Sequence, residues 1–104
     1  MDLDNNKIYW SKNGTFQNSG DPTSGATGTG AISITSGYDY FFSLSDASNP
    51  DTSVYSCNFG NGYFGTTAVS SAQNPDDGIG IFEYDVPAGY RALCTKSINA
   101  EEYS

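Results

Sequence analysis

The sequence predicts a small all-β domain, an antiparallel β-sandwich. Short runs rich in β-branched and aromatic residues alternate apolar and polar positions, as half-buried strands do. Turn signals made of Asn, Asp, Gly and Pro separate these runs at the spacing typical of a sandwich. The 12 glycines and the few long aliphatic side chains disfavour helices, and we predict none.

The first predicted element is a hairpin within the run DLDNNKIYWSKNGTFQ, residues 2–17. Asn13-Gly14 is the pair best suited to a two-residue hairpin turn, because both of its positions require positive φ. Residues 7–11 form the strand before the turn, and residues 15–17 start the strand that returns from it.

Later strands are expected in five apolar runs, at residues 31–35, 38–44, 54–59, 79–86 and 90–95. A Gly/Ser/Thr segment, residues 18–30, reads as a surface connector. We therefore assign residues 1–95 to the sandwich. Residues 96–104 are a polar tail that we expect to be loose or held by another chain.

Charge excludes several classes of partner. The chain has 104 residues, enough for one small domain, and a formal net charge of -8. Nucleic acid and anionic membranes would both be repelled, since binding to either depends on positive charge. No run reaches the ~18 apolar residues that a membrane span needs. We expect no nucleic-acid partner, no membrane and no cofactor.

The residues that could carry catalysis or bind metal are few. The chain has no His, the commonest general base and metal ligand. Asp2-x-Asp4-x-Asn6 is similar to the start of a calcium loop, but Lys7 stands where that loop needs Gly. We favour a turn there and predict no metal. Glu83 and Asp85 are two apart on one predicted strand face, which we interpret as solvated. An enzyme is not expected.

Three motifs, in this order, resemble the later half of a SPRY domain: DLDNNKIYWSKNG, then YFFSLSD with YSCNFG, then VPAGYRAL. They lie between residues 2 and 95, and the long loop at residues 18–30 is most similar to SPRY-like domains of bacteriophage structural proteins. The resemblance implies a concanavalin-like sandwich. It also implies further strands on the N-terminal side, which are absent here.

An incomplete sandwich has a physical consequence. Missing strands leave edge N–H and C=O groups and one face of the core exposed. We therefore expect another chain or segment to complete the sheets by strand addition. The first strand, residues 7–11, is the one we expect to need a neighbour from elsewhere.

The resemblance implies a non-enzymatic binding or assembly module, of the kind found in virion fibre or decoration proteins. Its partner would be a protein or a neighbouring subunit in an oligomer, or a surface glycan, in a virion or outside the cell. Loops at residues 18–30, 46–51 and 61–67 are the candidate contact regions. The candidate binding residues are Trp10, Asp21, Thr23, Asp46, Asn49, Asp51, Asn61 and Tyr63.

Two alternative functions stay open. One is a carbohydrate-binding module of a secreted protein, with Tyr9, Trp10 or Tyr63 stacking on sugar rings. The other is a subunit of an extracellular filament that takes its missing strands from its neighbours. For Trp10 we expect packing in the core, and an exposed stacking role is the alternative.

The two cysteines, Cys57 and Cys94, both lie at predicted strand positions. A disulfide would form if the strands bring their Cα atoms within ~4.4–6.8 Å. Two buried free thiols are the other prediction. In the resembled fold the two strands lie close enough for the bond.

Overall fold

The fold was obtained as a computed structural model, which describes residues 1–46 and 52–103. In this part of the chain six strands of two residues each form three separate antiparallel pairs. The predicted β character is confirmed in this coarse sense. The described residues do not show the predicted sandwich, since the three pairs share no sheet.

The predicted hairpin is confirmed. Strands β2 (Ser11–Lys12) and β3 (Thr15–Phe16) pair antiparallel, with Lys12 opposite Thr15. The two residues between them have the positive φ that this turn requires, 51° at Asn13 and 81° at Gly14.

Strand β1 (Lys7–Ile8) pairs with β4 (Ile32–Ser33), so that Lys7 lies opposite Ser33. The predicted strand at residues 7–11 is therefore two short strands, interrupted at Tyr9 and Trp10. Our expectation that this segment needs a neighbour from elsewhere is wrong, because β4 of the same chain supplies it.

The segment predicted as a plain connector, residues 18–30, is built from hydrogen-bonded turns. It includes two short 3-10 helices, η1 (Gln17–Ser19) and η2 (Gly25–Thr27). The backbone N–H of Asp21 donates to the carbonyl of Thr29 at 3.0 Å, which closes the loop on itself.

The third pair lies in the C-terminal half, where β5 (Tyr63–Phe64) pairs with β6 (Thr67–Ala68). The strands predicted at residues 79–86 and 90–95 are wrong. Residues 79–86 make only isolated bridges, at Ile81 and Phe82. Gly80, with φ 113°, bends the backbone away from the strand conformation just before these bridges.

The chain ends in a helix, α1 (Thr95–Tyr103), where we predicted a loose tail and no helix. Residues 90–104 contain neither Gly nor Pro, and Lys, Ala and Glu are good helix formers. Ser97, on the first turn, is only 2% exposed, so the start of the helix packs against the rest of the chain.

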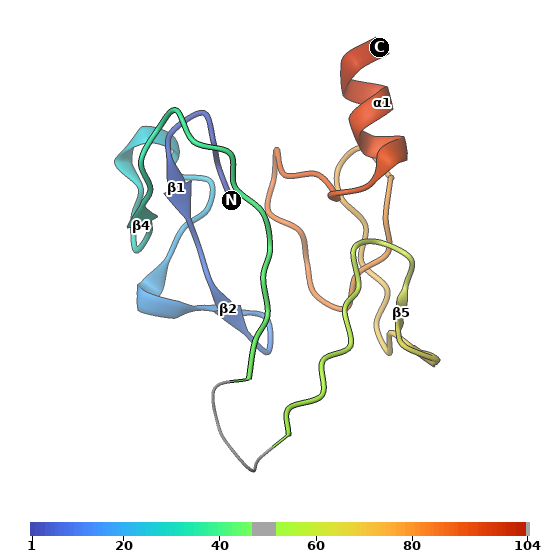
Figure 1. The fold of residues 1–104 in the computed structure, drawn as a ribbon. Coiled ribbons are helices and arrows are strands. Elements are labelled where there is room, and N and C mark those ends of the chain that lie inside the picture. The colour runs from blue at the N-terminus through green and yellow to red at the C-terminus, as the bar shows by residue number, and fades with distance from the viewer. Residues whose placement is uncertain (47–51, 104) are drawn as a thin grey trace.

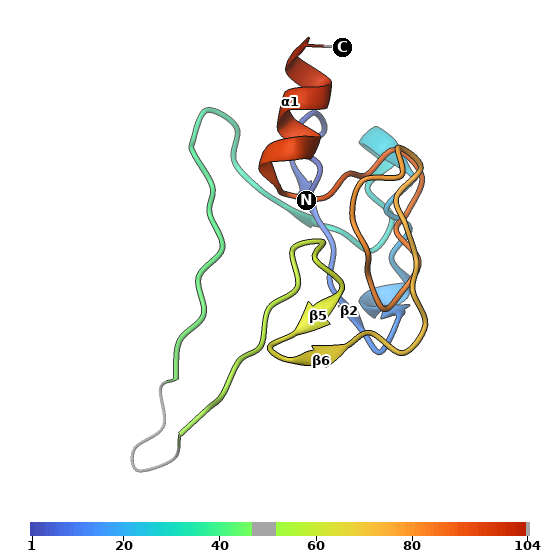
Figure 2. The same cartoon turned by 90° about the vertical axis from the view of Figure 1, so that its right-hand side faces the viewer.

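Two long segments, residues 35–46 and 52–59, extend away from the remainder and form what we call the arm (Figures 1 and 2). The strands predicted at residues 38–44 and 54–59 are extended here without becoming strands. Among the described residues of the arm, no backbone N–H is bonded to a backbone carbonyl.

The described residues contain almost no core. Ala92, 7% exposed, is the one buried hydrophobic residue among them, and no large side chain is fully buried. The radius of gyration is 15.1 Å, against about 13 Å expected for a domain of this length. This fold therefore buries less apolar surface than an independent domain normally does.

Candidate functional site

The arm presents apolar side chains to solvent. Phe41 is 85% exposed and Val54 is 88% exposed, although both are strong strand formers. Six further large apolar side chains of the arm are also exposed: Tyr38, Tyr40, Phe42, Leu44, Tyr55 and Phe59. Large apolar side chains exposed together on one part of a chain are typical of an interaction site.

Side chains, not a backbone ladder, hold the two segments of the arm beside each other. The Phe42 and Phe59 rings lie 5.9 Å apart between centroids and are tilted by 56°. The Tyr55 hydroxyl donates to the carbonyl of Ser45 at 2.9 Å. In residues 38–44 and 54–59 no described backbone N–H is bonded to a backbone carbonyl, so the backbone groups of these stretches are available to another strand.

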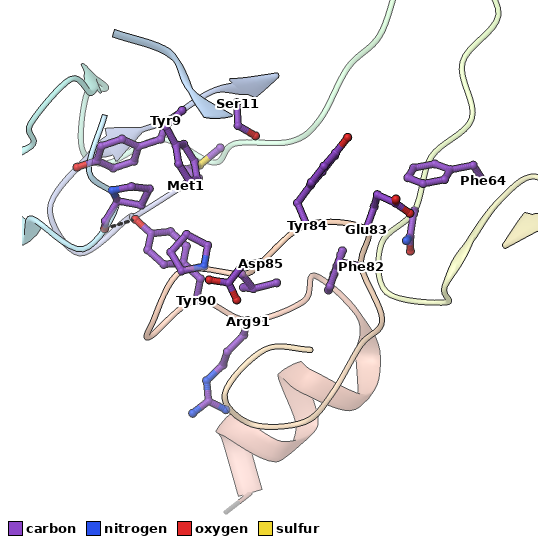
Figure 3. Close-up of a pocket in the computed structure, with 15 residues that line it drawn as sticks. Met1, Tyr9, Ser11, Phe64, Phe82, Glu83, Tyr84, Asp85, Tyr90 and Arg91 are labelled. Carbon is purple, nitrogen blue, oxygen red and sulfur yellow. Dashed lines mark hydrogen bonds between the residues drawn. The ribbon is translucent and has the colours of Figure 1, made fainter. Parts of the chain in front are cut away.

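A second feature is a cavity of about 340 Å³ between the N-terminal and C-terminal halves, which we call the aromatic cavity (Figure 3). Six aromatic rings line it: Tyr9, Phe16, Phe64, Phe82, Tyr84 and Tyr90. They come from segments far apart in the sequence, so the cavity exists only when the two halves are in place.

Two contacts join the halves at this cavity. The Tyr90 hydroxyl donates to the carbonyl of Pro22 at 2.9 Å, across 68 residues of sequence. The Tyr84 ring packs against Gly14, where a Cβ atom would come within 2.7 Å of the ring. Burial raises the pKa of Tyr90, and Asp2 adds to this effect by its charge.

Most polar groups that line the cavity already have partners. The Glu83 carboxylate accepts from the backbone N–H of Ser70 at 2.6 Å and from the Ser70 hydroxyl. The Asn58 amide donates to the carbonyl of Ile81 at 3.0 Å. The Tyr9 hydroxyl lies 3.2 Å from the Ser24 hydroxyl.

Comparisons of the chain with protein-family models, with curated proteins and with solved structures found no match. The resemblance to SPRY domains therefore stays a prediction from the sequence motifs.

The structure does not gather those predicted binding residues that it describes into one site, and none of these lines the aromatic cavity. Trp10 is 58% exposed, so our expectation that it packs in the core is wrong. Asn49 and Asp51 lie outside the described residues.

Of the other predicted binding residues, Tyr63 is 47% exposed on β5, and the rest bond to nearby backbone or side-chain groups. Asp21 accepts from both the backbone N–H and the hydroxyl of Thr23, at 2.9 and 2.6 Å. The side chain of Asn61 accepts from the backbone N–H of Tyr63 at 3.1 Å. Asp46, on the arm, accepts from the backbone N–H of Ser53 at 2.6 Å.

Cys57 and Cys94 are free thiols in this structure, so the disulfide is not formed. The alternative of two buried thiols is also wrong, because Cys57 is exposed on the arm and Cys94 is only partly buried. Both cysteines nevertheless line one shallow hollow of about 600 Å³, together with Asn61.

Sequence reasoning missed the aromatic cavity. Phe82, Tyr84 and Val86 line the cavity. Glu83 and Asp85, which we interpreted as a solvated strand face, line it as well, so the alternation along this segment did not predict the lining. Among the described residues, no group of three or more His, Cys, Asp or Glu side chains is placed to hold a metal, and no helix is long and apolar enough to cross a membrane.

Proposed function

We propose that this protein is a non-enzymatic binding and assembly module that acts through its arm. In this proposal the chain is part of a SPRY-type β-sandwich, and strands of a neighbouring subunit or another segment complete it. The setting that we propose is a virion fibre or decoration protein, in a virion or outside the cell, within an oligomer or larger assembly.

The observation that carries the proposal is the state of the arm. Its residues 38–44 and 54–59 have strand-forming sequences and extended backbones, yet they have no backbone hydrogen bonds among the described residues. Phe41 and Val54 are exposed on the same segments. Strand addition would satisfy the backbone groups and bury these side chains in one step.

The proposal also accounts for the missing core. A chain of this length normally buries about two thirds of the surface that its unfolded form exposes. The described residues instead leave large apolar side chains exposed throughout the arm. A partner on the arm supplies the burial that the isolated chain lacks.

The test is the mass in solution, by size-exclusion chromatography with light scattering. We expect species heavier than the 11.1 kDa chain, in amounts that rise with concentration. Val54→Asp places a charge in the proposed contact and should shift the protein to the monomer. Ile98→Asp is the matched control, because Ile98 is 55% exposed on α1 and lies outside the arm.

A second measurement decides how a monomer is to be interpreted. If the wild-type protein is a monomer and its arm amides are protected from hydrogen exchange, the arm has no need of a partner and the proposal fails. If Val54→Asp and Ile98→Asp reduce the mass equally, the association does not depend on the arm, and strand addition is again contradicted.

A further inference from the structure

We propose that the aromatic cavity binds a trimethylammonium group, a cation that ring faces attract without hydrogen bonds. This inference goes beyond the proposed function and does not depend on it, since assembly is assigned to the arm and the rings that line the cavity all lie outside the arm. Three observations support it: the rings, the charges and the polar groups that are already occupied.

The faces of the aromatic rings that line the cavity are available to a ligand. The one close ring pair among the described residues is Phe42 with Phe59, on the arm, and its rings are tilted by 56°. The six rings of the aromatic cavity make no such close pair with one another. A cation held within about 6 Å of such a ring is attracted by the negative charge density of its face. Figure 3 shows Tyr9, Tyr84 and Phe64 reaching the hollow from different segments.

The size of the cavity suits a small ligand or a single headgroup. Its volume of about 340 Å³ is at the lower end of the range, about 300–1,000 Å³, that is typical of ligand sites. A trimethylammonium group on a short chain fits this space, and its three methyl groups bring apolar surface to the rings.

The charges around the cavity favour a cation. The chain carries a net charge of -8. The carboxylate of Asp85 lines the cavity and has no hydrogen-bond or ion-pair partner among the described residues. Arg91 is also part of the lining, but its guanidinium lies 3.5 Å from Asp77 and points away from the rings (Figure 3). Met1 also lines the cavity, and burial lowers the pKa of its N-terminal ammonium, while the charge of Asp2 acts in the opposite direction.

Most polar side chains of the lining are occupied, so a sugar would find few partners besides the Asp85 carboxylate and the Tyr84 hydroxyl. A bound sugar needs several hydrogen-bond partners for its hydroxyls. The carboxylate of Glu83, the amide of Asn58 and the hydroxyl of Tyr90 already bond within the protein. A trimethylammonium group donates no hydrogen bond, so it does not have to displace these partners.

The experiment is titration calorimetry of the full chain at low salt, with choline as the probe. The uncharged tert-butyl analogue of choline has nearly the same shape, and glucose tests the carbohydrate alternative. We expect saturable choline binding that is at least about fivefold tighter than binding of the tert-butyl analogue. A trimethyl-lysine peptide, compared with its unmethylated form, shows whether the group is recognised on a protein or as a free headgroup.

Variants of the lining test the assignment residue by residue. Tyr84→Ala should weaken choline binding about two- to fivefold, whereas Tyr84→Phe keeps the ring and should bind like wild type. Asp85→Asn should weaken it about threefold at low salt and less at high salt. Ile98→Ala, on α1 and outside both the cavity lining and the arm, is the control and should have no effect.

Three results would overturn the inference. They are equal affinity for choline and its tert-butyl analogue, no saturation by choline at millimolar concentrations while the chain is folded, and tighter binding of glucose than of choline. Failure of Val54→Asp to change the mass would leave this test untouched, so the two proposals can fail separately.

Discussion

Many polar side chains of this protein bond to the backbone of a nearby turn. Asp2 accepts from the backbone N–H and the side-chain amide of Asn5, at 3.1 and 2.8 Å, and so fixes the turn before β1. Asp21 and Thr23 do the same in the loop at residues 18–30. Such groups are committed to the fold, because a ligand would have to replace bonds that already stabilise the turn.

The Glu83 carboxylate shows how this commitment affects stability. Hydrogen bonds from the Ser70 side chain, and then from the Ser70 backbone, hold the pKa of Glu83 below its ordinary value of 4.5. The folded state therefore favours the ionised form. This contribution to stability is present above pH 4.5 and is lost as the pH falls through the lower pKa of the folded state.

We predict that Glu83→Gln flattens the decline of melting temperature on the acid side, while changing its slope little near neutral pH. The reason is that glutamine does not titrate, so one carboxylate no longer takes up a proton on acid unfolding. Thermal unfolding followed over a pH series measures this. Ser70→Ala removes the hydroxyl donor and keeps the backbone N–H donor. It should therefore also flatten the decline of melting temperature at acid pH. If the melting temperature of both variants declined at acid pH as steeply as that of the wild type, the lowered pKa of Glu83 would be contradicted.

At the scale of elements, the hairpin β2–β3 depends on one glycine for two reasons. Gly14 has φ 81°, a conformation that costs other residues strain. It also lies against Tyr84, with room for no Cβ atom. Gly37 has nearly the same φ, 85°, but has no atom within 4 Å of a Cβ added there.

Substitutions at Gly14 and Gly37 separate the cost of backbone strain from the cost of crowding against Tyr84. We predict that Gly37→Ala costs about 1 kcal/mol from backbone strain alone, and that Gly14→Ala costs at least about 1 kcal/mol more because the ring must also move. The difference in the free energy of unfolding, measured by urea denaturation, is the readout. Equal losses for the two variants would show that Tyr84 does not pack on the hairpin.

The elements that could be predicted from the sequence are those whose conformation depends on their own residues. Asn13 and Gly14 determine their turn through their own φ preferences, so the hairpin was predictable. Residues 38–44 have the composition of a strand, but a strand also needs a neighbour, and the chain provides none within the described residues. The helix α1 was missed because its sequence has little apolar periodicity and its helical preference is modest.

The candidate sites were predictable to different degrees. The exposed arm follows from the expectation of missing strands, although we assigned the need for a neighbour to residues 7–11 and not to residues 38–44 and 54–59. The aromatic cavity requires Tyr84 and Tyr90 to meet Tyr9, which no spacing in the sequence specifies. Long-range contacts of this kind depend on the whole fold.

At the scale of the molecule, the two halves meet at the aromatic cavity. The hydrogen bond from Tyr90 to the carbonyl of Pro22 is the longest-range side-chain bond among the described residues. Pro22 is buried, so a carbonyl that lost its donor there would be poorly compensated by water.

We predict that Tyr90→Phe destabilises the protein by about 1 kcal/mol, because it removes this hydrogen bond while keeping the ring. Tyr84→Phe is the matched control, since its hydroxyl has no partner among the described residues, and it should be nearly neutral. The free energy of unfolding from urea denaturation distinguishes the two. Equal effects would mean that the hydroxyl of Tyr90 does not hold the halves together.

The arm also determines how the chain responds to proteases. Enzymes of the chymotrypsin type cut after large apolar side chains in exposed, extended segments, and Phe41 and Tyr55 offer such sites on the only covalent path between residues 1–34 and residues 60–103. One cut would turn the chain into two fragments held together without a covalent bond, by Tyr90 on Pro22 and Tyr84 on Gly14. The same cut would destroy the surface through which we propose that the protein assembles, so a bound partner should also protect the chain from digestion.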